Sequence, residues 1–196
     1  MKLSFVNCKQ VDRINFKIMK NWICTICMSF ISVLAFGQTL KPVDEGSSVK
    51  FVIKNFGINT PGSFEGLSGI IQYNAENPVS SEFDVSVKAA SIDTDIKARD
   101  NHLMKDEYFD VEKFPVLHFK STKITLTNSA EHLYMFGVIT IKGISKEIKF
   151  PFTVKSTDGG YLFQGTFTLN RRDFNLGGKS ISLSDEVNVD LSILAR

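Results

Sequence analysis

The stretch Ile148-Lys149-Phe150-Pro151-Phe152-Thr153-Val154-Lys155 places an apolar side chain at every second position, with mostly polar side chains between them. A period of two is typical of a β-strand with one buried face. The same pattern indicates strands at residues 49–54, 83–89, 161–169 and 187–193, and shorter ones at 67–73, 116–120, 124–127 and 133–142. The chain is therefore expected to be all-β.

Turn-forming residues separate these segments, for example at 74–78, 158–160 and 177–178. Short strands with polar outer faces and frequent turns favour an antiparallel sandwich or barrel. Periodicity does not distinguish the two, because the interior of an eight-stranded barrel either fills with side chains or holds one small ligand. Only the segment near 98–107 breaks the pattern convincingly, and it is predicted to be a short helical insert.

The first 37 residues have the features of a leader. A short basic start at Met19 and Lys20 precedes an apolar run over 22–36, and Ala35-Phe36-Gly37 offers a small-x-small cleavage site. The run is about 15 residues long, short of the roughly 20 that span a bilayer. We predict that 1–37 is an N-terminal extension plus a cleavable signal peptide, with Met19 as the true start. An uncleaved membrane anchor is the alternative.

Cleavage would change both the cysteine content and the charge. The three cysteines, Cys8, Cys24 and Cys27, all lie in the leader, so the mature chain would hold no disulfide and no thiolate site. The leader also holds five of the 23 basic and one of the 21 acidic residues, which leaves 18 basic and 20 acidic and a formal net charge of −2. This composition favours a periplasmic or secreted bacterial protein and does not indicate a nucleic-acid partner.

An ordered set of motifs runs along nearly the whole mature chain. It includes Gly62-Ser63-Phe64-Glu65-Gly66, read as a turn, then Ser91-Ile92-Asp93-Thr94 with Arg99-Asp100-Asn101-His102-Leu103, then residues 137–143 and Arg172-Asp173-Phe174. In these motifs the chain resembles the YceI-like family. The resemblance implies one domain over 38–196, an antiparallel eight-stranded lipocalin-like barrel, with an elongated apolar cavity that binds a polyisoprenoid or quinone-like chain non-covalently.

In such a barrel the alternation projects one face of each strand into the cavity. The apolar residues expected to line it are Phe51, Ile53, Phe83, Val85, Val87, Phe119, Phe150, Phe152, Phe163, Phe167, Val189 and Leu191. Asn55, Arg99, His102 and Arg172 are the polar candidates for the portal. Many relatives carry His at the position of Asn55, so a role that depends on an imidazole there is in doubt.

Arg99, Asp100 and His102 form the one compact cluster of chemically capable side chains. Three interpretations are open: they pin the insert to the barrel by hydrogen bonds, they line a ligand portal, or they act in catalysis. Asp100 and His102 point apart on a helix, which counts against a dyad. His102, His118 and His132 lack ligand spacing, so no metal site is expected, and His118 is predicted to face outward with Lys120.

The sequence therefore predicts an exported binding protein that holds a polyisoprenoid, quinone or similar long-chain amphiphile. It is expected to have no cofactor and no membrane span after processing, and to be a monomer or weak homodimer. An alternative from a different class is a closed-core structural or partner-binding module, related to stress and without a small ligand. An enzyme acting on a lipid through His102 or Arg99 ranks last, because no nucleophile–base pair is visible.

Overall fold

The computed structural model describes residues 37–128 and 132–196. Apart from Gly37, the expected leader lies outside the described residues. Within the described ranges, ten strands form one antiparallel sheet. The strands are β1 (Gln38–Leu40), β2 (Pro42–Asn55), β3 (Ile58–Phe64), β4 (Ser68–Tyr73), β5 (Glu82–Lys88), β6 (Val116–Leu126), β7 (Leu133–Ile141), β8 (Ile144–Thr157), β9 (Gly160–Asn170) and β10 (Leu183–Ala195).

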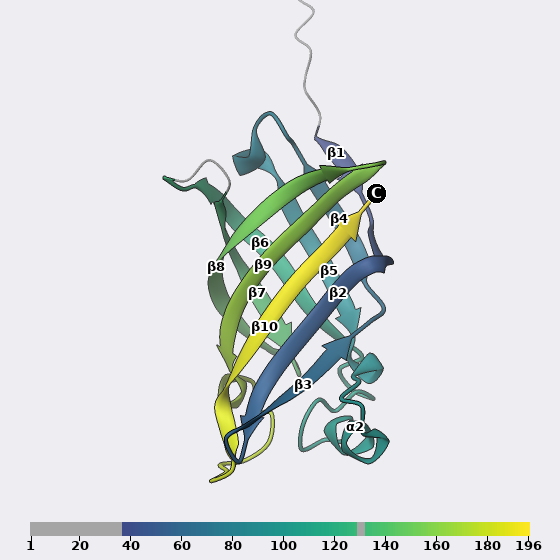
Figure 1. The fold of residues 1–196 in the computed structure, drawn as a ribbon, viewed down its shortest axis with the longest axis vertical. Helices are drawn as coiled ribbons and strands as arrows, with labels where there is room; N and C mark the ends of the chain where they lie inside the picture. The colour runs from purple at the N-terminus through teal and green to yellow at the C-terminus, as the bar shows by residue number, and fades with distance from the viewer. Residues whose placement is uncertain (1–36, 129–131) are drawn as a thin grey trace, which may run out of the picture. The chain divides into compact units, whose positions relative to one another are not determined.

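The sheet curls around on itself in the order β1-β4-β5-β6-β7-β8-β9-β10-β2-β3. β1 pairs with β4, whereas β2 pairs with β10 near the other end of that order. Only Lys41 separates β1 from β2, and it exchanges two backbone hydrogen bonds with Arg196, the residue that follows β10. The continuous segment from β1 to β2 therefore joins the two sides of the sheet. Figure 1 shows β8, β9, β10 and β2 crossing in front of β4 to β7.

The predicted all-β antiparallel barrel with a helical insert is confirmed, but with ten strands rather than eight. The reading of residues 62–66 as a turn was wrong, because Gly62, Ser63 and Phe64 lie in β3 and the chain turns only after Phe64. β3 is the last strand of the sheet, and an edge strand of this kind tolerates a proline such as Pro61, which lies opposite Val52 of β2. The candidate strands 116–120 and 124–127 are one strand, β6, with a register shift between Ser121 and Lys123.

The insert after β5 begins with the 3₁₀ turn η2 (Ala89–Ser91) and continues into helix α2 (Lys97–Leu103). The helix is shorter than the predicted 98–107, because the chain folds back after Leu103 and the Phe109 N–H bonds to the Leu103 carbonyl. Asp93 exchanges two backbone hydrogen bonds with Ser63 in β3, and η2 also contacts β6. The insert therefore contacts β3 on one side and β6 on the other, and it forms part of the barrel wall between these two strands. No helix in the described part of the chain is long and apolar enough to cross a bilayer.

Candidate ligand-binding cavity

The barrel contains a cavity of about 380 Å³ that is open to solvent and lined mainly by aliphatic and aromatic side chains. Strand alternation turns these side chains inward and leaves the charged residues between them on the outer face. All twelve apolar positions predicted from that alternation lie in the cavity wall. Their contact with a ligand stays a prediction.

Glycines opposite two phenylalanines keep the interior from filling. The Phe51 ring lies over Gly62 of β3, where a Cβ atom would stand 2.3 Å from the ring. The Phe119 ring lies over Gly137 of β7 in the same way, at 2.4 Å. Any larger residue at either glycine would push the ring away from the wall. The rings therefore lie along the barrel wall, and an interior rich in phenylalanine still retains a cavity.

One end of the cavity is closed by packed aromatic rings. Tyr73 makes edge-to-face contacts with Tyr161 at 4.7 Å and with Phe163 at 5.3 Å between ring centroids, and Phe163 meets Phe83 at 5.1 Å. Burial, with a smaller contribution from Tyr161, raises the pKa of the Tyr73 hydroxyl above its ordinary value. Phe83 and Phe163 belong to the cavity wall, whereas Tyr73 and Tyr161 lie behind them. A ligand tail that reached this end would meet aromatic and aliphatic side chains, including Ile71 and Met135 of the same cluster.

A group of polar residues lies in the cavity wall contributed by the β2–β3 hairpin and the insert. Asn55 and Thr60 come from the hairpin, and Arg99, His102 and Tyr108 come from the insert. Asn55, Thr60, Arg99 and Tyr108 are partly exposed and His102 is exposed, so the lining reaches solvent here. Three of the four predicted portal residues, Asn55, Arg99 and His102, are thus in the wall of the cavity.

Arg99 and Asp100 hold the insert in shape. The Asp100 carboxylate accepts hydrogen bonds from the Thr94 N–H at 2.9 Å and from the Thr94 hydroxyl, and Arg99 Nε donates to that hydroxyl oxygen at 2.8 Å. Arg99 also donates to the Thr94 carbonyl. This network closes the segment from Thr94 to Asp100 on itself, while the neighbouring Asp93 supplies the attachment to the barrel. His102 stands outside the network, with its ring against Tyr108 at 5.0 Å.

Arg171, not the predicted Arg172, lies in the cavity wall. The 3₁₀ turn η3 (Arg171–Phe174) follows β9, and Arg171 continues the inward-facing series of Phe167 and Leu169, whereas Arg172 is exposed. The Arg171 side chain is 3% exposed and donates to the carbonyls of Ser184, Leu176 and Gly178 at 2.8–3.0 Å. It also pairs with the Asp185 carboxylate at 2.8 Å. One guanidinium thereby fixes the β9–β10 connection beside the cavity.

We expect Arg171→Lys to lower the free energy of unfolding by about 2 kcal/mol, because a lysine ammonium cannot reproduce the planar fork and leaves carbonyls without a donor. Arg172→Lys is the matched control, since this side chain is exposed, and it should change stability by less than about 0.5 kcal/mol. Denaturant unfolding of both variants measures the difference. Equal stabilities would show that Arg171 does not hold the connection.

His118 faces outward, as predicted. Its ring nitrogen lies 2.8 Å from the Asp84 carboxylate, which also pairs with Lys120 at 3.3 Å. The hydrogen bond from His118, followed by the contribution of Lys120, lowers the pKa of Asp84. Within residues 37–128 and 132–196, no three His, Cys, Asp or Glu residues are grouped closely enough to hold a metal ion.

Comparison with known proteins agrees with this architecture. The model of the YceI-like domain matches residues 39–195. A UPF0312 protein of Pseudomonas savastanoi is 30% identical over 86% of this chain and 90% of its own length. The crystal structure of BcnA from Burkholderia cenocepacia superposes with a TM-score of 0.72 at 23% identity, covering 76% of this chain and 96% of BcnA.

A polyisoprenoid binding domain from Saccharophagus degradans has the same fold, with a TM-score of 0.64 at 13% identity over 82% of this chain and 98% of that domain. The family match covers the whole described barrel, from β1 to β10. The motifs around Ser91 and Arg99 that carried the resemblance form the insert in the barrel wall. The chain belongs to the YceI-like family.

Proposed function

We propose that this protein is exported and binds one polyisoprenoid, quinone or similar long-chain amphiphile inside the barrel. The observation that carries the proposal is the apolar cavity of about 380 Å³, with packed rings at one end and solvent-accessible polar residues elsewhere in its wall. Its volume falls within the range of ligand pockets, roughly 300–1,000 Å³. The fold shared with a polyisoprenoid binding domain supports the same ligand class.

The polarity of the wall suggests one orientation for the ligand. Each methylene-sized group that leaves water gains about 0.8 kcal/mol, so the tail belongs against Phe83 and Phe163. The head group then lies near Asn55, Arg99 and His102. The Arg99 guanidinium is held by Thr94, which fixes its position before a ligand arrives and reduces the entropy lost on binding.

The other two functions receive less support. A closed-core structural module requires a filled interior, whereas the interior contains a cavity. Nucleophilic catalysis requires a nucleophile next to a base, and His102 contacts the Tyr108 ring rather than such a partner. We therefore propose binding without chemical conversion, with a signal peptide in residues 1–37 directing the protein to the periplasm and with the mature protein acting as a monomer or weak homodimer.

The volume of the cavity also limits how much of a ligand's hydrocarbon chain it can hold. At about 30 Å³ for each water-sized group, 380 Å³ accommodates on the order of a dozen methylene-sized groups. We expect the affinity for a homologous series of straight-chain alcohols to rise about fourfold per methylene up to that length and then to level off. Competition against a fluorescent fatty probe measures the series. Affinity that does not depend on chain length would contradict the proposal.

A further inference from the structure

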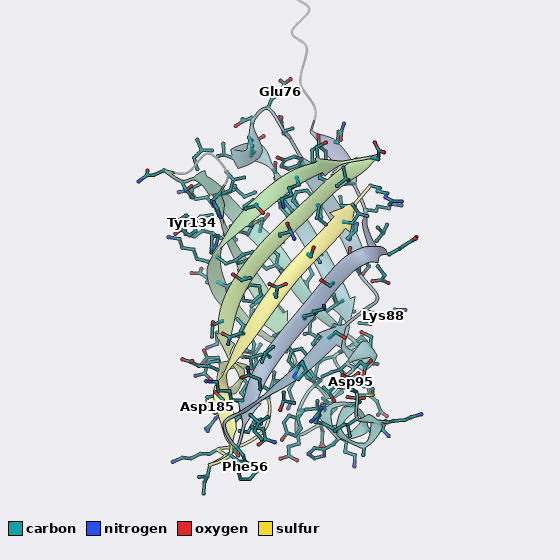
Figure 2. All side chains as sticks on the ribbon, in the orientation of Figure 1. Phe56, Glu76, Lys88, Asp95, Tyr134 and Asp185 are labelled. Carbon is teal, nitrogen blue, oxygen red and sulfur yellow. The ribbon has the colours of Figure 1, made fainter. Side chains whose placement is uncertain are left out.

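Three large apolar side chains are exposed together at the end of the β2–β3 hairpin. Phe56 is 80% and Ile58 is 71% exposed, and Ile181, in the β9–β10 connection, is fully exposed. The Phe56 N–H donates to the Ser182 carbonyl at 2.8 Å, which holds that connection against the hairpin. We call Phe56, Ile58 and Ile181 the apolar tip. Figure 2 shows Phe56 at the lower extremity of the barrel.

Neither the backbone conformation nor the packing of the barrel explains why a phenylalanine occupies position 56 in the β2–β3 turn. Phe56 and Gly57 form the two-residue turn of the hairpin with φ values of 49° and 77°. Positive φ at both positions is the pattern of a type I′ turn, which favours Asn followed by Gly and disfavours bulky residues at the first position. The exposed Phe56 ring has no packing to offset that conformation. A strained and exposed aromatic residue indicates a role outside folding.

The apolar tip adjoins the polar part of the cavity wall. Asn55 and Leu183 face each other in the β2–β10 ladder, and both line the cavity. Asn55 directly precedes Phe56, and Leu183 lies two residues after Ile181. A surface that received the tip would therefore lie next to the part of the wall where the lining reaches solvent.

Exposed cations accompany the tip. Lys54 precedes it in β2, and Arg172 and Lys179 lie in the β9–β10 connection with Ile181. None of the three forms an ion pair with another described residue. In the same connection Asp173 is exposed, whereas Asp185, at the start of β10, is already paired with Arg171. Lysine and arginine beside exposed apolar residues are typical of proteins that bind the interface of a lipid bilayer.

We propose that the apolar tip inserts into the interfacial region of a lipid bilayer and holds the adjoining cavity wall at the membrane surface. A protein partner fits less well, because a stable protein interface needs roughly 800 Å² from each side, more than three side chains at a hairpin end supply. Docking is a property of the outer surface, so it goes beyond the proposed ligand binding and is testable without it. Membrane docking would serve the proposed ligand binding, because it would bring the cavity to a membrane in which the amphiphile is dissolved.

The experiment is flotation of the purified mature protein with vesicles of phosphatidylcholine, alone or mixed with phosphatidylglycerol. We expect weak, reversible binding that phosphatidylglycerol strengthens several-fold. Phe56→Asn should lower the partition coefficient about tenfold, since tenfold corresponds to about 1.4 kcal/mol and burial of a phenylalanine side chain provides at least that. Asn suits the turn, so the melting temperature should stay unchanged or rise.

Leu126→Asn is the matched control. Leu126 is 69% exposed at the β6–β7 end of the sheet, which Figure 1 shows opposite the β2–β3 hairpin, and this variant should bind vesicles like the wild type. The proposal is overturned if the wild type does not float with either vesicle, or if Phe56→Asn and Leu126→Asn lose binding equally. It is also overturned if Phe56→Asn dissociates a dimer in sedimentation velocity without changing vesicle binding, because the tip would then contact a second copy.

Discussion

Phe163→Ala is expected to lower the free energy of unfolding by about 3–5 kcal/mol, the largest loss of stability that we anticipate from one substitution. Phe163 is 5% exposed and its ring packs between Tyr73 and Phe83 at 5.3 and 5.1 Å. Truncation removes these edge-to-face contacts and opens a void next to an existing cavity. The surrounding strands cannot collapse into that void, because hydrogen bonds fix their spacing.

Phe136→Ala serves as the control for ring loss alone. Phe136 lies on β7 with its ring 5.1 Å from the Lys149 ammonium on the outer face of the barrel. Its removal should cost about 1 kcal/mol or less. Chemical denaturation of both variants measures the two losses. The packed rings at this end of the cavity would not contribute to the core if Phe163→Ala lowered the free energy of unfolding no more than Phe136→Ala does.

Val189→Trp is expected to weaken binding of a long-chain alcohol about fiftyfold while leaving the fold intact. Val189 lies in the cavity wall on β10, between Phe51 of β2 and Phe167 of β9. An indole there occupies space that the ligand needs, and displacement of about three methylene-sized groups costs about 2.4 kcal/mol. Because the ring enters a cavity rather than a packed region, stability should change by about 1 kcal/mol or less.

Asp190→Trp is the matched control, since Asp190 neighbours Val189 on the same strand but is exposed on the outer face. It adds the same ring without filling the cavity, and its affinity should equal that of the wild type. Displacement of a fluorescent fatty probe compares the three proteins. If both tryptophan variants bind as tightly as the wild type, the ligand does not occupy the cavity.

Alternation in the sequence was sufficient to assign the faces of the strands, because the period of two reflects the pleat itself. Phe51, Phe150 and Val189 were placed on the inner face from local sequence alone, and the structure puts all three in the cavity wall. Closure of the sheet depends on pairing between distant segments, as between Leu194 and Val43, which no local pattern encodes. Only the resemblance to a known family separated a barrel from a sandwich.

The errors in the predictions can each be traced to particular residues. β3 was missed because Pro61 and Gly62 indicate a turn, and only its position as the last strand makes them compatible with pairing. Arg172 was chosen because it belongs to the motif Arg172-Asp173-Phe174, although the alternation through Phe167 and Leu169, continued by two residues, places Arg171 on the inner face. The cavity was undetermined because composition shows how many rings face inward, not that the Phe51 ring lies over Gly62 and leaves space beside it.

The measurement that tests ligand binding most directly is mass spectrometry of an organic extract from mature protein exported and purified without detergent, with Val189→Trp and Asp190→Trp prepared in parallel. We expect about one isoprenoid, quinone or fatty species for each wild-type and Asp190→Trp molecule and a strongly reduced amount for Val189→Trp. Extracts equally empty of lipid for all three proteins, or equally loaded for all three, would contradict a ligand held in the cavity.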